Sequence, residues 1–333
     1  MNSPLLHLDR LSGLARVRTD TPLAAIEQAL YEQGFTIGFI GGDENAPLSA
    51  YLSGERALDP HLRNGEARLL VAGVVVKDAA GREAATLVAP RSAAGPDWRA
   101  VLMGRGATGP DLVEATLRVR RVPMVKRRGV FAAAFFDEAI AVLRDQTQAK
   151  NRPSLVRVYG PEAAERLKLD ADRRLVVFEY EGDPEDVGFR AVRLSDALAL
   201  RRGEKLDAEM LGAAPPLFFP PEDGRPEAVL HAWARWSALI PLLHDLVRRS
   251  GGVYPLQTTV SGLAHEAALL SIRLLTYEGE GDPLTVTREV EDLLELFSEW
   301  RAGVVEVRSL TGRPDRRWRE AFSDPLTARV FGR

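Results

Sequence analysis

The 333-residue sequence contains no cysteine. This absence excludes disulfides, thiolate catalysis, iron–sulfur clusters and cysteine zinc sites. Histidine is scarce as well. The five histidines are scattered along the chain, with no spacing typical of metal ligands: they are His7, His61, His231, His244 and His265. The sequence therefore predicts no metal centre.

Long apolar runs and a strong net charge are also missing. Apolar stretches such as Val71–Val76 and Ala132–Phe136 are far too short to span a membrane. The first residues show no basic segment followed by an apolar one, so they do not read as a signal peptide. The net charge of −3 at pH 7 gives no reason to expect a nucleic-acid partner. We expect a cytoplasmic protein, and its Ala-, Gly-, Arg- and Leu-rich composition is typical of a GC-rich bacterial genome.

The first part of the chain alternates short strand and helix patterns. A helix is predicted over Leu23–Gln33, with apolar residues on one face and Thr21 or Asp20 as its N-cap. Strands are predicted at Leu14–Thr19, Ala67–Lys77 and Glu83–Val88. The last two form a hairpin around the turn at Asp78–Gly81.

After Pro123 the pattern changes to strands and helices that suggest an antiparallel sheet with helices on one face. Lys126–Arg128 is interpreted as a surface hinge, and Gly212–Pro226 as a linker or mobile loop. We find no internal repeat. The predicted strands are Gly129–Phe135, Ser154–Tyr159, Arg174–Tyr180, His265–Tyr277 and Gly303–Val307, and the predicted helices are Phe136–Ala149, Pro161–Leu167, Ala228–Arg249 and Asp282–Trp300.

The segment Pro90–Pro123 carries the most specific sequence motifs of the chain. It contains Gly95-Pro96-Asp97, Met103-Gly104 and Glu114-Ala115-Thr116 in that order. This frame resembles the segment "GPD…MGSEGTLGVITEAT" of the FAD-linked oxidase family. That family includes D-lactate dehydrogenases, glycolate oxidase subunits and alkylglycerone-phosphate synthase. The middle of the Pro90–Pro123 segment differs from the family pattern, because Arg105-Gly106-Ala107 stands where the family has Ser-Glu-Gly.

The resemblance extends, at low identity and in the family's order, over roughly Leu14 to Glu306. It implies an α+β fold with two parts. Residues 1–124 would be a truncated remnant of the FAD-binding, PCMH-type domain, and residues 125–333 would be a C-terminal cap domain with an antiparallel sheet and flanking helices.

Two departures from the family bear on function. The chain starts where the family's pyrophosphate-binding subdomain would already have ended, so the phosphates of FAD would lack their backbone cradle. The stretch Gly303–Arg319 matches the family's histidine-containing loop but holds no histidine. We expect FAD to be absent or weakly bound. We also expect a second copy of the chain, another subunit or the repacked cap to cover the face that the subdomain would leave.

Candidate site residues follow from the same resemblance. By family position, mostly through the backbone, the flavin contacts would be Ile37, Gly38, Ser49, Gly54, Gly65, Asp111 and Leu112. Candidates for catalysis or substrate contact are His265, as a general base, and Arg317, as an anion-binding guanidinium. Their alternatives are an exposed strand-end histidine and a solvated basic face.

Two functions remain open. The leading hypothesis is a divergent FAD-linked oxidase homologue without flavin chemistry that acts as a binding or assembly subunit. The competing hypothesis is an FAD-dependent oxidoreductase on a 2-hydroxy acid or similar small carboxylate, like a glycolate oxidase subunit, completed by a partner chain.

Overall fold

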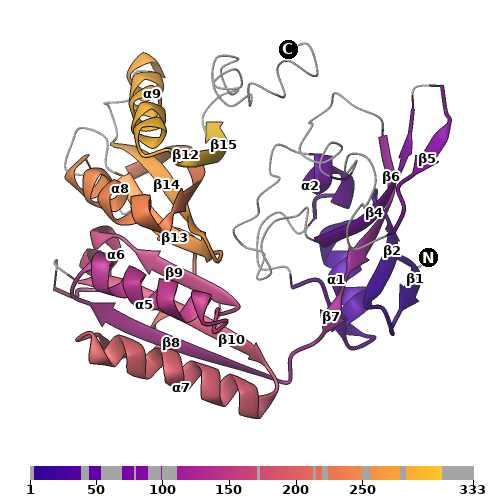
Figure 1. The fold of residues 1–333 in the computed structure, drawn as a ribbon. Coiled ribbons are helices and arrows are strands. Elements are labelled where there is room, and N and C mark those ends of the chain that lie inside the picture. The colour runs from indigo at the N-terminus through magenta and orange to yellow at the C-terminus, as the bar shows by residue number, and fades with distance from the viewer. Residues whose placement is uncertain are drawn as a thin grey trace. The chain divides into compact units, whose positions relative to one another are not determined.

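The computed structural model describes residues 4–38, 45–53, 70–78, 80–88, 99, 111–170, 173–212, 215–219, 224–249, 256–277 and 283–309. The chain divides into two compact units, Met1–Met124 and Val125–Arg333 (Figure 1). Each unit has its own hydrophobic core.

Unit 1 (Met1–Met124) is built on a five-stranded antiparallel sheet in the order β1-β2-β6-β4-β5, with a small β3-β7 ladder beside it. Its elements are β1 (Leu5–Asp9), β2 (Leu14–Arg18), α1 (Leu23–Tyr31), β3 (Phe35–Thr36), α2 (Leu48–Ser53), β4 (Val71–Lys77), β5 (Glu83–Ala85), β6 (Asp111–Arg118) and β7 (Arg120–Arg121).

Alternation and helical spacing explain the core of unit 1. Ala15 and Val17 of β2 are buried while Arg16 and Arg18 are exposed, and α1 buries Leu23, Ile26 and Leu30 on one face. The predicted hairpin is confirmed, because β4 pairs with β5 and Asp78 accepts hydrogen bonds within the turn. The predicted N-cap is wrong: Pro22 occupies the cap position and no side chain caps α1. Asp20 instead forms an ion pair with Arg18 at 2.7 Å.

Unit 2 (Val125–Arg333) is built on an eight-stranded antiparallel sheet in the order β11-β8-β10-β9-β13-β14-β12-β15. Its elements are β8 (Val125–Ala133), α5 (Phe136–Gln148), β9 (Leu155–Tyr159), α6 (Pro161–Arg166), β10 (Arg174–Gly182), α7 (Pro184–Leu200), β11 (Glu204–Leu206), the 3₁₀ helix η1 (Ala208–Leu211), β12 (Gly224–Arg235), α8 (Trp236–Arg249), β13 (Leu256–Leu263), β14 (Ala267–Tyr277), α9 (Pro283–Glu299) and β15 (Gly303–Ser309).

This sheet is a tandem repeat of one β-α-β-β-α-β motif. The first repeat runs β8-α5-β9-β10-α7-β11, with the short α6 inserted, and the second runs β12-α8-β13-β14-α9-β15. Their strand orders, β11-β8-β10-β9 and β13-β14-β12-β15, mirror each other, so both have the ferredoxin-like arrangement. The expectation of no internal repeat is therefore wrong at the level of structure.

The two repeats join where β9 pairs with β13, at a place we call the repeat junction. Tyr159 pairs with Thr259 and Val158 with Val260. The ladder continues past the end of β9, since the Gly160 N–H donates to the Thr258 carbonyl at 2.9 Å. One continuous sheet results from two motifs that each contribute an edge strand.

The main core of unit 2 lies on the face of the sheet that carries α5, α7, α8 and α9. Along β10, Val176, Phe178 and Tyr180 belong to this core, whereas Leu175 and Val177 belong to a smaller cluster on the opposite face. The strand is thus buried on both faces, as its nearly continuous apolar sequence indicates.

Several predictions for unit 2 need correction. The predicted helix Ala228–Arg249 is a strand, β12, as far as Arg235, and only the remainder is the helix α8. The strand β13 and the helix α7 were not predicted. The supposed hinge Lys126–Arg128 lies within β8, where Arg128 pairs with Glu179 and Lys126 with Glu181 of β10.

Candidate functional site

Two of the predicted flavin-contact positions lie at the end of β3 in unit 1. The N–H of Ile37 donates to the carboxylate of Glu27 on α1 at 2.9 Å, and the N–H of Gly38 donates to the hydroxyl of Thr36 at 2.8 Å. Thr36 itself donates to Glu27. Gly38 has φ +77°, a conformation that favours glycine. Both backbone donors are therefore used inside the unit.

Two further positions meet around the buried Thr19. Ser49, on α2, donates its N–H to the Thr19 carbonyl at 2.6 Å. The Thr19 hydroxyl donates to the carbonyl of Leu112 on β6. The structure thus brings Ser49 and Leu112 together through Thr19, while Asp111 is exposed and pairs with Lys77 across the sheet. Gly54, Gly65 and most of the Pro90–Pro123 segment lie outside the described residues.

A row of polar side chains crosses the unit 2 sheet on the face opposite the four core helices. His231 on β12 lies with Nδ1 2.8 Å from the Ser271 hydroxyl on β14. The Ser271 hydroxyl lies 2.7 Å from that of Ser261 on β13. All three residues are buried. Because hydroxyls and imidazole each donate and accept, this chain of hydrogen bonds can hold or pass a proton across three strands.

Arg157 on β9 extends this row by one strand. It is only 1% exposed, and its Nη1 donates to the Ser261 carbonyl at 2.9 Å and to its own Val156 carbonyl at 2.8 Å. We call Arg157, Ser261, Ser271 and His231 the polar row. A guanidinium and an imidazole on one face are groups that can bind a carboxylate and move a proton, respectively.

A buried carboxylate lies beside the repeat junction. Glu162, on α6, accepts a hydrogen bond from the Thr258 N–H at 3.0 Å through Oε1. The residue as a whole is half-buried, but its Oε2 has no solvent contact and no hydrogen-bond partner among the described residues. Burial raises the pKa of Glu162 to about 7. Burial also lowers the pKa of the neighbouring Arg273 guanidinium to about 10, against the opposing charge of Glu162.

His265, the sequence candidate for a general base, lies in the turn between β13 and β14 and is exposed. Its carbonyl accepts hydrogen bonds from Trp236 Nε1 at 3.0 Å and from Gln148 Nε2 at 3.4 Å. No described contact joins its ring to the polar row. Arg317, the other candidate, lies outside the described residues.

The sequence interpretation missed the polar row. His231 was one of the scattered histidines, and its strand was predicted to be helical. Its partner Ser271 is 40 residues away in sequence, so only the pairing of β12 with β14 brings the two together. The signal that could have found it is the alternation of buried apolar residues along β12, which leaves His231 on the other face.

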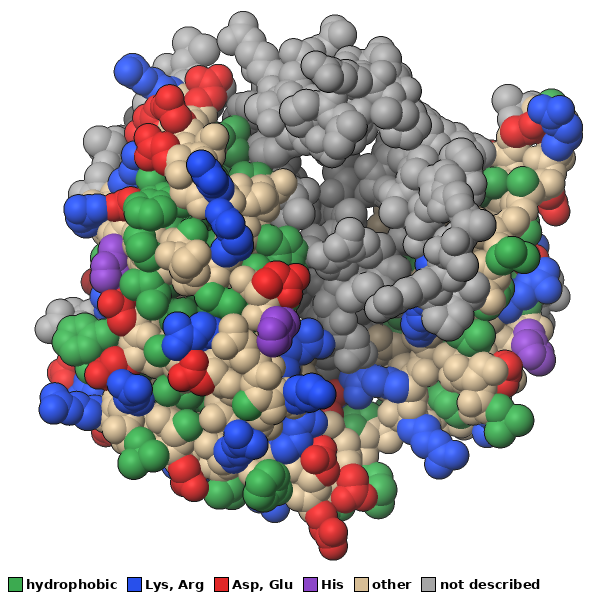
Figure 2. All heavy atoms as spheres, viewed as in Figure 1, with side chains coloured by type: hydrophobic (Ala, Val, Ile, Leu, Met, Phe, Trp, Pro, Cys, Tyr) green, Lys and Arg blue, Asp and Glu red, His purple; other side chains and the backbone are tan. Residues whose placement is uncertain are grey.

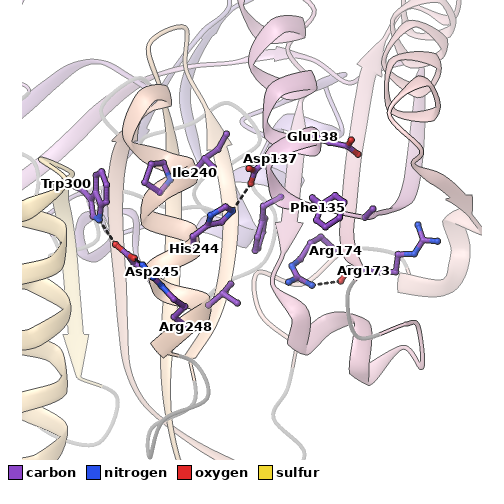
Figure 3. A pocket seen from close by; sticks show the side chains of 14 residues that line it. Phe135, Asp137, Glu138, Arg173, Arg174, Ile240, His244, Asp245, Arg248 and Trp300 are labelled. Carbon is purple, nitrogen blue, oxygen red and sulfur yellow. Dashed lines mark hydrogen bonds and ion pairs between the residues drawn. The ribbon is translucent and has the colours of Figure 1, made fainter.

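A pocket of about 920 Å³ lies on the helical side of unit 2, between the start of α5 and the helix α8 (Figure 3). Its apolar wall includes Phe135, which is 62% exposed, and Ile240 and Val247. Across the pocket, His244 points toward Asp137 and lies 2.7 Å from its carboxylate.

Three other charged residues of the pocket wall, Asp245, Arg248 and Arg174, also have partners. Asp245 accepts from Trp300 Nε1 at 2.8 Å and pairs with Arg248. Arg174 packs over the Phe136 ring at 5.2 Å. The pocket therefore offers a ligand mainly apolar surface.

No group of three or more His, Asp or Glu side chains among the described residues could hold a metal ion. No helix among these residues is long and apolar enough to cross a membrane.

No family model and no curated protein sequence matches this chain. Solved structures do match, among them alkyldihydroxyacetonephosphate synthase in two crystal forms. Both give a TM-score of 0.70 at 15% sequence identity over 90% of this chain. The chain spans 60% and 61% of the length of those two structures. The α+β fold predicted from the sequence is confirmed, and it is the fold of the FAD-linked oxidase type.

Proposed function

We propose that this chain is a divergent homologue of the FAD-linked oxidases that acts as a binding or assembly subunit and performs no flavin chemistry itself. In this proposal unit 1 is the counterpart of part of the FAD-binding domain and unit 2 is the counterpart of the cap domain. The chain would work in the cytoplasm with a second copy of itself or with another protein.

One observation carries this proposal. The N–H groups of Ile37, Gly38 and Ser49 would have to face a flavin as donors, but each already donates to a partner inside unit 1. Releasing them would leave the Glu27 carboxylate and two other acceptors without these bonds, and each lost bond costs about 1 kcal/mol. These residues therefore do not fit a flavin ring bound by their backbone, and we derive no reaction step through FAD.

A second candidate function rests on the polar row. An FAD-dependent oxidoreductase acting on a 2-hydroxy acid or similar small carboxylate needs a cation for the carboxylate and a group that takes a proton. Arg157 and His231 are residues of these types on one face of unit 2, but they are only 1% and 4% exposed, so a substrate would reach them only if this face opened. In this alternative a partner chain would supply the donors for FAD.

The experiment that separates the two is an absorbance spectrum of the purified protein in the visible region, before and after addition of FAD. We expect no flavin band that stays with the protein through gel filtration. A stoichiometric flavin band would overturn the leading proposal and favour the second.

A variant then tests the second candidate directly. If FAD is bound, His231→Asn should lower turnover of small 2-hydroxy acids without removing the flavin band. His244→Asn, a change of the same kind on the helical side of unit 2, should leave turnover unaltered. Equal turnover in wild type and His231→Asn would exclude the polar row as the site of proton transfer.

A further inference from the structure

A short segment lies across the unit 2 sheet on the face opposite the core helices. Residues 215–219, which we call the strap, are held there by side chains of three strands, β9, β13 and β14. Three of the strap carbonyls accept hydrogen bonds, in the pairs Tyr159 to Pro216, Thr259 to Leu217 and Arg273 to Phe219. The Phe219 ring packs against the Tyr159 ring at 4.9 Å, and both residues belong to the smaller core cluster on this face. The strap therefore contacts both repeats.

Arg273, on β14, is the cation that holds the strap, and its partners are all neutral. Its Nε donates to the side-chain oxygen of Gln257 at 2.8 Å, and its Nη2 donates to the same oxygen and to the Phe219 carbonyl. The Phe218 ring lies 4.9 Å from the guanidinium carbon. Among the described residues, no carboxylate forms an ion pair with Arg273.

The charge of Arg273 is therefore not neutralised at close range. Taking a guanidinium out of water costs free energy that an anionic partner normally offsets, and burial here lowers the pKa of Arg273 to about 10. Its remaining nitrogen, Nη1, is not enclosed and donates to none of the described residues. Nη1 and Nη2 form the edge of a guanidinium that can bind both oxygens of a carboxylate. The Phe219 carbonyl takes only one N–H of this edge.

The surroundings of Arg273 favour an anion with a single charge. Glu162, on α6, is the acidic side chain that acts on the Arg273 guanidinium, and Arg174, on β10, is the basic one that acts on Glu162. When Glu162 is ionised, its charge repels an anion bound to Arg273, and a second negative charge on that anion would add to the repulsion.

No broad basic field supports anion binding on the part of unit 2 that Figure 2 shows. Acidic and basic side chains are spread together over this visible face, and the chain as a whole has a net charge of −3. A ligand held by Arg273 would therefore be recognised by this one cation and the groups around it, and not by long-range attraction.

We propose that Arg273 is a binding site for the carboxylate of a small monoanion, and that the strap competes with this ligand through the Phe219 carbonyl on the same guanidinium edge. A carboxylate forms charge-assisted hydrogen bonds, which are stronger than those of a peptide carbonyl. The ligand can therefore displace the Phe219 carbonyl while Tyr159 and Thr259 hold the rest of the strap. The proposal depends neither on FAD nor on a second subunit.

Saturation-transfer NMR with acetate as the probe, at constant ionic strength, tests the site. Arg273→Gln should weaken acetate binding about tenfold or more, because the charge and the edge are both lost. Arg273→Lys keeps the charge but not the planar edge, so its affinity should lie between those of wild type and Arg273→Gln. Arg235→Gln, the same change at an exposed position of β12, should bind acetate like wild type.

Competition by the strap is tested by a variant expected to act in the opposite direction. Tyr159→Phe removes the hydroxyl that donates to the Pro216 carbonyl, so it should loosen the strap and tighten acetate binding. Tyr180→Phe is the matched control, because the Tyr180 hydroxyl donates to the Asn151 carbonyl, away from the strap, and its loss should leave acetate binding unaltered.

The charge argument is tested by pH and by a second probe. Wild type should bind acetate about threefold more weakly at about pH 8 than at about pH 6, because Glu162 loses its proton in this range. Glu162→Gln should bind acetate equally at both pH values. Inorganic phosphate, mostly a dianion at about pH 8, should bind wild type more weakly than acetate does.

Equal acetate binding by wild type and by both Arg273 variants would overturn the proposal, as would wild-type protein that binds no acetate. Unaltered or weaker binding by Tyr159→Phe would show that the strap does not compete. Tighter binding of phosphate than of acetate would overturn the assignment to a monoanion. Circular dichroism verifies that each variant is folded. None of these outcomes bears on the flavin spectrum, so failure here is distinct from failure of the proposed function.

Discussion

The buried carboxylate of Glu162 makes the stability of unit 2 depend on pH in an unusual direction. Burial raises its pKa from 4.5 to about 7. The folded protein therefore keeps the proton in a range where the unfolded chain has lost it, and unfolding releases that proton. The stabilising contribution is fully present below pH 4.5 and is lost as the pH rises to about 7.

The size of the effect follows from the shift in pKa. At about 1.4 kcal/mol per unit, the rise from 4.5 to about 7 corresponds to roughly 3 kcal/mol of unfolding free energy. Glu162→Gln removes the titration but keeps an oxygen that can accept from Thr258 N–H. Relative to wild type, the variant should therefore gain about 3 kcal/mol between about pH 4 and about pH 8. Burial of the amide in the Glu162→Gln variant can also shift the unfolding free energy by a constant amount at every pH. Such a shift would not alter the pH-dependent difference between the variant and wild type.

Urea unfolding followed by tryptophan fluorescence at a series of pH values measures the effect. Four of the five tryptophans, Trp233, Trp236, Trp300 and Trp318, belong to unit 2 and Trp98 belongs to unit 1. The measurement is therefore made in a Trp98→Phe background, in which the signal reports on unit 2. Glu165→Gln is the matched control, because it makes the same change at an exposed position of α6. The reasoning is refuted if the Glu162→Gln and wild-type curves run parallel across this pH range.

Three substitutions test the packing of unit 2 by the same urea assay. Ser271→Ala removes a hydroxyl that lies 2.8 Å from His231 Nδ1, and should cost about 1–3 kcal/mol; a loss below about 0.5 kcal/mol would mean that the polar row is not a structural network. Gly129→Ala would place a Cβ 2.3 Å from the Phe178 ring, and should destabilise by at least about 2 kcal/mol unless the ring can move. Gly188→Ala, inside α7, meets only ordinary contacts and should stabilise by about 0.5–1 kcal/mol; destabilisation would contradict its helical geometry.

Local patterns predicted much of this fold. The helix predicted at Phe136–Ala149 is confirmed as α5, and its apolar residues Phe136, Ile140 and Leu143 recur at helical spacing and are buried in the structure. The β4-β5 hairpin was recognised from its turn chemistry around Asp78. Both signals are contained within about ten residues of sequence, so no tertiary information was needed.

The wrong secondary-structure predictions arose where the amino-acid composition favoured a helix although the chain forms a strand. Residues 228–249 are rich in alanine and leucine, which favour helix, so the change from strand to helix at Trp236 was not visible. Tertiary pairing with β14 and β15 overrides this propensity in β12. The helix α7 was recognisable, because Asp183 caps the N–H of Glu185 and Pro184 occupies the first helical turn.

The candidate site was less predictable than the fold. The polar row combines residues from four strands, and its members Arg157 and Ser261 are 104 residues apart in sequence. Such a group forms only when the two repeats have joined. The flavin-contact positions, by contrast, came from a resemblance, and the bonds of Ile37 and Ser49 within unit 1 could not be read from it.

The repeat junction suggests how unit 2 arose. Each repeat contributes its second strand, β9 or β13, to the same antiparallel contact. A protein with only one such motif would expose that strand as a free edge, and two copies could pair through it with two-fold symmetry. Gene duplication and fusion would convert that association into an intramolecular one. The two motifs would then stay together because a peptide linker joins them, without needing a high protein concentration. The two halves would then be free to diverge, with Arg157 in one and His231 in the other, which a symmetric pair of identical chains could not achieve.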